Sequence, residues 1–172
     1  MPSDPDHPVI SIEGERVALG PMGRDQIPAY HRWLSNFDTL RSQGEPPQLP
    51  ETVESLERWF DSHVSRREDV AWFTVYDRAT FQPIGWTELK EIDHHHGTAE
   101  FAIMIGVLEA RGRGLGTEVT RLMMEYGFER IGLHNIHLYY MGFNAGARKA
   151  YERSGFREYG RRTGAHRSGH QR

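Results

Sequence analysis

Residues 100–117 read Glu-Phe-Ala-Ile-Met-Ile-Gly-Val-Leu-Glu-Ala-Arg-Gly-Arg-Gly-Leu-Gly-Thr, and this stretch is the most informative part of the chain. It opens with alternating Phe101, Ile103 and Ile105, residue types that suit a buried strand. It then becomes polar and rich in glycine. The residues that follow place apolar side chains on one face of a helix: Leu115, Val119, Leu122, Met123 and Tyr126. The pattern therefore predicts a strand, a tight turn and the start of a helix.

A turn of this kind is well suited to binding phosphate. Gly112, Gly114 and Gly116 let the backbone curl so that several N–H groups converge, and the helix start adds unpaired donors and a positive dipole end. Arg111 and Arg113 are expected to add charge at the rim. The Gly-Lys pair of a Walker loop is absent, and the glycine spacing differs from that of a dinucleotide site. On the loop alone, an ordinary glycine-rich turn remains the alternative.

Composition narrows the class of protein. The chain has 172 residues and a formal net charge of −3, which favours neither nucleic acid nor an anionic membrane as a partner. It has no apolar run of about 18 residues, the length expected of a membrane-spanning helix. With no Cys, it has no thiolate zinc site and no cysteine nucleophile. We expect a cytoplasmic protein with a flexible tail over residues 1–8 and a single domain over residues 9–172.

Periodicity and turn residues predict an order of elements along the chain. The expected order is a strand, two helices, three antiparallel strands, a helix, a strand, a helix and a strand. The ranges are strand 10–22, helices 25–34 and 52–64, strands 70–76, 84–89 and 100–105, a long helix ending near Gly132, strand 137–141, helix 144–154 and strand 156–162. The run His94-His95-His96 is expected to form a polar hairpin turn and to bind no metal, because consecutive strand residues point to opposite faces.

Two motifs carry a resemblance to a known family. Arg111-x-x-Gly114-x-Gly116, between a strand and a helix, resembles the acyl-coenzyme A pyrophosphate loop of the GNAT acetyltransferase superfamily. A second motif contains Asn144, Ala147, Tyr151, Ser154 and the closing pair Gly155-Phe156. The resemblance implies an α+β fold in which a mixed, mostly antiparallel sheet is flanked by helices and splays at the cofactor cleft.

Other stretches refine this resemblance. The opening Ile12-x-Gly14-x-Arg16-Val17-x-Leu19 looks most like the ribosomal-protein N-terminal acetyltransferase branch, with polyamine and antibiotic acetyltransferases nearby. The superfamily usually has one more strand after the position of residues 156–162. Residues 163–172 contain no apolar run, so that strand is expected to be missing or very short. An open sheet edge would favour a homodimer.

The resemblance implies acetyl-CoA as co-substrate and assigns residues to it. The backbone of Met104, Ile105 and Gly106 should run beside the pantetheine arm, with one amide polarising the thioester carbonyl. Gly106 also fits a plain strand end. Loop and second-motif residues complete the expected cofactor site: Arg111, Gly112, Arg113, Gly114, Leu115, Gly116, Thr117, Asn144, Ala147 and Tyr151.

The same resemblance suggests the groups that move protons. Glu100 is the first candidate for the base that receives a proton from the amine, and Glu88 is the second; both are expected to contact the substrate. Glu100 could instead be a surface charge or pair with an arginine. Tyr151 is the candidate acid for the leaving thiolate, with a half-buried aromatic anchor as its alternative. Trp33 lies where this fold usually shapes the acceptor pocket.

Two classes of function fit these residues. The first is an acetyl-CoA-dependent N-acetyltransferase that transfers acetyl directly to a primary amine of a small molecule or a protein N-terminus. The second is a non-catalytic CoA-binding sensor or scaffold module. The presence of both Glu100 and Tyr151 favours the enzyme. A peptide α-amine, a polyamine and an antibiotic all remain open as acceptors.

Overall fold

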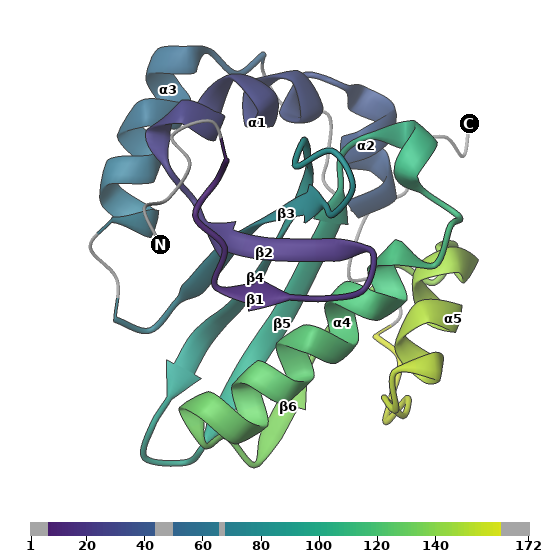
Figure 1. Ribbon diagram of the computed structural model, residues 1–172. Helices are drawn as coiled ribbons and strands as arrows, with labels where there is room; N and C mark the ends of the chain where they lie inside the picture. The colour runs from purple at the N-terminus through teal and green to yellow at the C-terminus, as the bar shows by residue number, and fades with distance from the viewer. Residues whose placement is uncertain (1–6, 44–49, 66–67, 163–172) are drawn as a thin grey trace.

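The computed structural model describes residues 7–43, 50–65 and 68–162 (Figure 1). They form one six-stranded sheet in the order β1-β2-β3-β4-β5-β6. Its strands are β1 (Ile12–Glu13), β2 (Val17–Pro21), β3 (Ala71–Asp77), β4 (Pro83–Asp93), β5 (Thr98–Ile105) and β6 (Asn135–His137). Every neighbouring pair is antiparallel except β5 and β6. The mixed, mostly antiparallel sheet predicted from the sequence is therefore confirmed. Parts of the predicted tail and C-terminus, residues 1–6 and 163–172, lie outside the described ranges.

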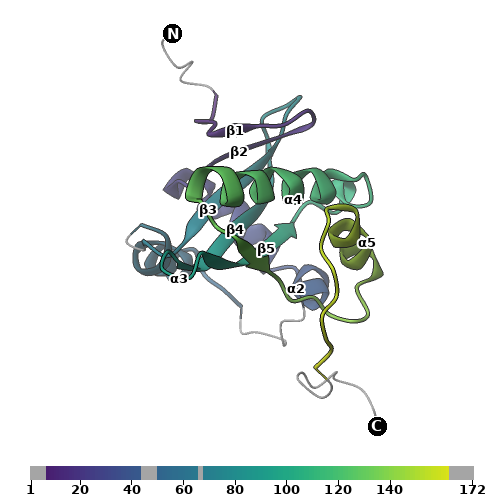
Figure 2. The same ribbon diagram turned by 90° about the horizontal axis from the view of Figure 1, so that it is seen from below.

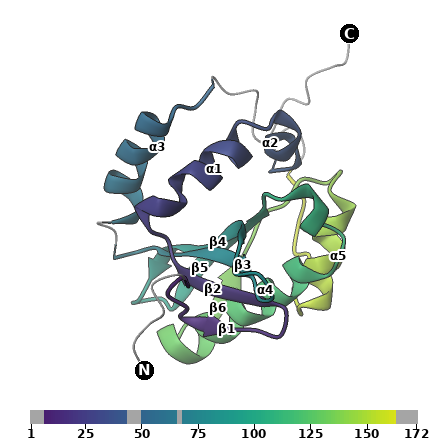
Figure 3. The same cartoon turned by 45° about the horizontal axis from the view of Figure 1, so that its top comes forward.

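Helices cover both faces of the sheet. The α-helices are α1 (Ile27–Leu34), α2 (Phe37–Gln43), α3 (Val53–Trp59), α4 (Leu115–Glu125) and α5 (Ala145–Arg153). Figure 2 shows α4 on one face and α2 and α3 on the other, and Figure 3 shows α1, α2 and α3 grouped together away from α4 and α5. Both α3 and α4 continue as wider turns, to Val64 and Ile131. Gly132 ends the α4 segment in the left-handed conformation, as the sequence predicted.

Alternation along the strands builds a separate core on each face. On the α4 face, inward side chains of β2, β3, β4 and β5 pack against Leu115, Val119 and Met123 of the helix. On the other face, Met104 of β5 joins a cluster that includes Tyr30 and Trp33 from α1. The two faces of β5 thus contact different layers of the protein.

β5 and β6 part after three residues. Their parallel ladder pairs Thr98–Glu100 with Asn135–His137 and ends there. The following residues, 138–143, form no strand, and α5 begins after the N-cap Asn144. Beyond the pair of Glu100 with His137, β5 forms no further ladder pair on its β6 side, and we call this part of the strand, up to Ile105, the open edge; β4 continues to pair with it on the other side.

Three predicted elements need correction, and one helix was not predicted. The single strand predicted at 10–22 is a hairpin of β1 and β2, because the chain turns at residues 14–16 and the two short strands pair antiparallel. The strand predicted at 137–141 is β6 at Asn135–His137, because the chain turns away from β5 after His137. The strand predicted at 156–162 does not form within the described residues: Phe156 packs on Phe101, and Glu158 bonds through its side chain to Tyr140 and Arg161. Helix α2 was not predicted. Its N-terminal amides, from Asp38 and Thr39, bond to the side chain of Asn36.

We expect Gly106→Ala to lower the free energy of unfolding by about 1–3 kcal/mol. A Cβ at Gly106 would overlap the indole ring of Trp33, which is buried in the second core. Gly160→Ala is the matched control, since a Cβ there meets nothing within 4 Å. Urea unfolding of the two variants measures the difference. Equal free energies of unfolding would show that packing against Trp33 does not require a glycine at position 106.

Candidate active site

The glycine-rich loop forms the predicted turn. Gly112 and Gly114 have φ values of 71° and 79°, in the region that favours glycine, and Gly114 is the N-cap of α4. The first N–H groups of α4 therefore open toward the loop. The Leu115 side chain is buried in the core, so only its backbone faces this region, whereas Thr117 lines a cavity beside the loop.

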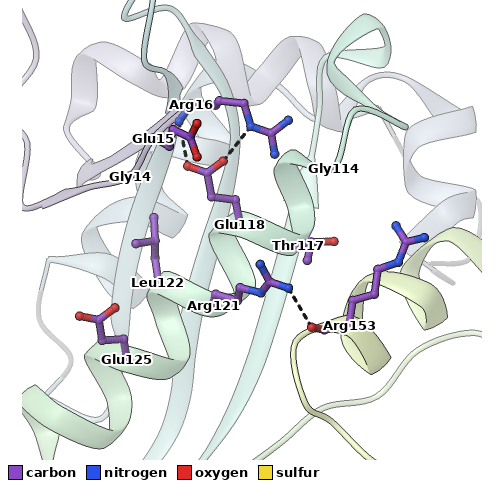
Figure 4. A pocket seen from close by; sticks show the side chains of 10 residues that line it. All are labelled: Gly14, Glu15, Arg16, Gly114, Thr117, Glu118, Arg121, Leu122, Glu125 and Arg153. Carbon is purple, nitrogen blue, oxygen red and sulfur yellow. Dashed lines mark hydrogen bonds and ion pairs between the residues drawn. The ribbon is translucent and has the colours of Figure 1, made fainter.

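Arg16 and Glu118 hold the loop from the side of β2. The Glu118 carboxylate accepts hydrogen bonds from the Arg16 backbone N–H at 2.8 Å and from the Arg16 guanidinium at 3.1 Å (Figure 4). The same guanidinium donates to the carbonyl oxygen of Arg113 at 2.8 Å. This clamp joins the β1–β2 hairpin, the loop and the first turn of α4, so it fixes the direction of the loop amides.

The two loop arginines lie in different places. Arg113 is exposed, as expected of a charge at the rim. Arg111 instead turns under the loop, where it donates to the Ile105 carbonyl at 2.8 Å and to the Thr39 hydroxyl at 3.3 Å. Burial lowers the pKa of the Arg111 guanidinium below its ordinary value. The Arg111 side chain therefore connects α2, the loop and the end of β5.

A cavity of about 450 Å³ lies on the outer side of this loop and along α4. Figure 4 shows its lining, in which the Arg121 side chain extends from α4 toward α5 and donates to the Arg153 carbonyl at 3.1 Å. The lining residues are Gly14, Glu15, Arg16, Gly114, Thr117, Glu118, Arg121, Leu122, Glu125 and Arg153. The space next to the loop is thus open and bordered by three arginines and three glutamates.

The backbone N–H of Ile105, near the end of β5, points into the gap left by β6. Residues of an antiparallel pair alternate between bonding to the neighbour and facing away. Gly106 donates its N–H to the Ile84 carbonyl of β4 at 2.8 Å, and Val107 donates to the same carbonyl at 3.2 Å. The N–H and C=O of Ile105 must then point away from β4, and that carbonyl is the one bonded by Arg111. Of the three residues predicted here, Ile105 has the amide in the gap, while Met104 is buried on the α1 face.

Tyr151 reaches this gap from the α4 face. Its ring lies 6.2 Å from that of Phe101 and 6.1 Å from that of Phe156, both edge-on. Burial raises the pKa of the Tyr151 hydroxyl to about 12, so it stays protonated at neutral pH. Asn144 of the second motif lies about two turns before Tyr151, where it caps α5 by accepting from the Ala147 N–H at 3.0 Å, as predicted.

Glu100 and Glu88 lie on the opposite face. Glu100 accepts from Lys90 at 3.0 Å and has His137 at 3.9 Å, so its partner is a lysine and not an arginine. Glu88 is 7% exposed and stands on β4 directly beside Ala102 of β5. Because side chains alternate along a strand, Glu100 and the Phe101–Tyr151 contact are on different faces of β5. The open edge is the place where a group from each face can meet.

Within the described ranges, no helix is both long and apolar enough to cross a membrane.

Residues 16–157 match the protein family described as an acetyltransferase (GNAT) domain. The chain is 31% identical over 140 residues to the spermidine N(1)-acetyltransferase of Escherichia coli strain K12, which covers 81% of this chain and 72% of that protein. It is 35% identical over 128 residues to the alpha/beta-tubulin-N-acetyltransferase 9 of Drosophila melanogaster, with 67% and 61% covered. The crystal structure of spermidine N-acetyltransferase from Vibrio cholerae in complex with CoA and spermine has a TM-score of 0.77 at 28% identity, over 86% of this chain and 84% of that chain. The chain belongs to the GNAT family and is an N-acetyltransferase that uses acetyl-CoA as its co-substrate.

Proposed function

We propose that this enzyme acetylates a primary amine of a small polyamine at the open edge of β5. The observation that carries the proposal is the pair of carboxylates, Glu88 of β4 and Glu100 of β5, on the face of the sheet opposite Tyr151. Carboxylates on that face favour a cationic acceptor, and a polyamine carries several ammonium groups at neutral pH. The relatives named for spermidine support the same class of acceptor.

The cofactor is proposed to lie on the α4 side. The loop from Arg111 to Thr117 receives its diphosphate, and the pantetheine follows the edge of β5 toward Tyr151. Gly116 supports this placement. Its φ is not positive and a Cβ there meets nothing within 4 Å, so neither strain nor packing in the protein requires a glycine. A ligand that approaches the backbone closely would require one.

The amine is proposed to approach from the Glu88 and Glu100 side. At pH 7, freeing the lone pair of an alkyl amine costs roughly 4.6 kcal/mol, so a nearby carboxylate that accepts the proton matters. The amine nitrogen then bonds to the thioester carbon while the Ile105 amide stabilises the oxyanion. The C–S bond breaks as the tetrahedral intermediate collapses, and CoA leaves as a thiolate that takes up a proton from solvent. The nitrogen proton passes through water toward the carboxylates, of which Glu88 lies nearer than Glu100 to Ile105.

Tyr151 is proposed to stabilise the leaving sulfur mainly by hydrogen bonding. A thiol has a pKa near 8.5, whereas that of Tyr151 is about 12. Complete proton transfer from the phenol to a thiolate would be uphill by roughly 5 kcal/mol. A donated hydrogen bond lowers the energy of the developing charge without that cost, and solvent can supply the proton afterwards.

Several finer expectations stay predictions. These are the ribosomal-protein branch, the cytoplasmic location, the homodimer, and the absence of nucleic-acid and membrane partners. A protein N-terminus remains the second acceptor class, because one relative carries a tubulin acetyltransferase name. One solved relative, from Vibrio cholerae, is described as a dodecamer, so an assembly larger than the predicted dimer should be included when the oligomeric state is measured.

We expect Gly116→Ala to weaken acetyl-CoA binding at least about tenfold without loss of stability. Alanine in a helix favours folding by up to about 1 kcal/mol over glycine, whereas its methyl group would fill the space proposed for the diphosphate. Calorimetric titration with acetyl-CoA and a thermal melt measure the two effects, and Gly160→Ala serves as control. Unchanged affinity would place the diphosphate elsewhere.

A thiol-release assay over a spermidine, a peptide α-amine and an aminoglycoside panel tests the acceptor class. We expect kcat/KM for spermidine to exceed that for the other two by at least about tenfold, because the carboxylates favour a multiply charged acceptor. Preference for the peptide would overturn the polyamine proposal and favour the second class. Tight acetyl-CoA binding with no transfer to any amine would argue against turnover by this chain.

We expect Tyr151→Phe to lower kcat at least about tenfold, with acetyl-CoA affinity nearly unchanged. In the wild-type enzyme, the rate should rise with pH as the amine loses its proton. Since the pKa of Tyr151 is about 12, its ionisation should cause no fall in rate near pH 10. Steady-state kinetics from pH 6 to about pH 10.5 check both points. Wild-type turnover in the variant would remove Tyr151 from the mechanism.

A further inference from the structure

A cavity of about 300 Å³ lies beside the carboxylates, beneath α3 and its continuation. We call it the aromatic cavity, and its lining is Trp59, His63, Val70, Trp72, Glu88, Lys90 and Glu91. We propose that the aromatic cavity binds the second ammonium group of a diamine or polyamine whose first amine is acetylated at the open edge of β5. The inference rests on the proposed function and specifies how that site selects substrates that carry a second ammonium group.

Sheet register places the cavity at a suitable distance from the reaction. Trp72 of β3 stands beside Glu88 of β4, and Glu88 stands beside Ala102 of β5. Neighbouring strands are about 4.8 Å apart and successive residues of a strand about 3.3 Å, so the backbone of Glu88 lies roughly 11 Å from that of Ile105, and that of Trp72 roughly 14 Å. A substrate lying diagonally across the strands would keep one nitrogen at the edge near Ile105 and direct the next toward the Glu88 carboxylate and the cavity.

The cavity has the aromatic surface that favours a cation. The rings of Trp59 and Trp72 meet edge-on at 5.0 Å, and Trp86 stacks on Trp72 at 4.7 Å. Trp72 donates its indole N–H to the Tyr30 hydroxyl at 3.1 Å, which fixes the ring in place. Indole faces attract ammonium groups, and a ring already held rigid loses little entropy when a ligand binds.

The charges around the cavity favour the same ligand. Lys90 is an ammonium group already in this environment, and it bonds to Glu100 at 3.0 Å. Partial burial works to lower its pKa, yet the hydrogen bond and charge of Glu100, with the charges of Glu88 and Glu91, raise that pKa above its ordinary value. Three carboxylates therefore surround one resident ammonium group. A second ammonium group in the cavity would be attracted by the same carboxylates.

The test compares a diamine with a monoamine of equal chain length, 1,4-diaminobutane and butylamine, in variants of the cavity. We expect the wild-type ratio of their kcat/KM values to favour the diamine, and Glu91→Gln and Trp59→Leu each to lower this ratio about tenfold through the KM of the diamine. Glu129→Gln, an exposed glutamate on the far end of the α4 segment, is the matched control and should leave the ratio unchanged. A ratio unaffected by both cavity variants, or an equal loss for both amines, would overturn the inference.

A binding measurement keeps this test separate from the proposed function. Calorimetric titration of 1,4-diaminobutane into the protein saturated with CoA requires no turnover. We expect binding that Glu91→Gln weakens and Glu129→Gln does not. If the enzyme acetylates amines but Glu91→Gln does not weaken binding of the diamine, the role of the aromatic cavity is contradicted and the proposed function is not. Binding with the expected difference but no acetyl transfer would retain the cavity and remove the proposed reaction. Thermal melts of each variant confirm that the fold is intact.

Discussion

The site depends on the early separation of β6 from β5. A strand normally continues its ladder with a neighbour, because backbone N–H and C=O groups need hydrogen-bond partners. Here the rings of Tyr151 and Phe156 pack against Phe101 from the α4 face. They act as a wedge beyond the last ladder pair, Glu100 with His137. The N–H of Ile105 is directed into the gap by the register of β5 with β4, and β6 forms no ladder pair there.

The two faces of the sheet give the open edge two different environments. The loop, the first amides of α4 and Tyr151 lie on the α4 face of the open edge. The clamp between Arg16 and Glu118 fixes the position of the loop relative to β2. The other face brings carboxylates and tryptophans. A phosphate-bearing cofactor is stabilised by positive charge, whereas a cationic amine is stabilised by negative charge. Because the sheet separates these two environments, neither weakens the other.

Local patterns explain which features could be predicted from the sequence. The strand, loop and helix of residues 100–117, the cap at Thr52, the turn at His94-His95-His96 and the end of α4 near Gly132 depend on neighbours within a few residues. The inward turn of Arg111 and the clamp between Arg16 and Glu118 could not be predicted, because their partners are distant in the chain: 102 positions separate Arg16 from Glu118. Arg16 and Arg111 lie in stretches that carry the family resemblance, but the sequence alone does not show which residues they contact. The strand after α4 was predicted too late in the chain, at 137–141, because Leu138 and Tyr139 have strand-forming side chains, whereas the ladder with β5 ends at His137.

The separation of the two faces also bears on how acetyl is transferred. A covalent acyl-enzyme would need a nucleophilic side chain at the thioester, and the chain contains no Cys. The proposed site provides instead an amide for the oxyanion, a phenol beside the leaving sulfur and carboxylates beside the incoming nitrogen. These groups act on a tetrahedral intermediate formed by amine and thioester together, so both substrates must be bound before chemistry begins. The sheet edge then contributes chiefly by orientation, because it brings two ligands held on opposite faces to one point.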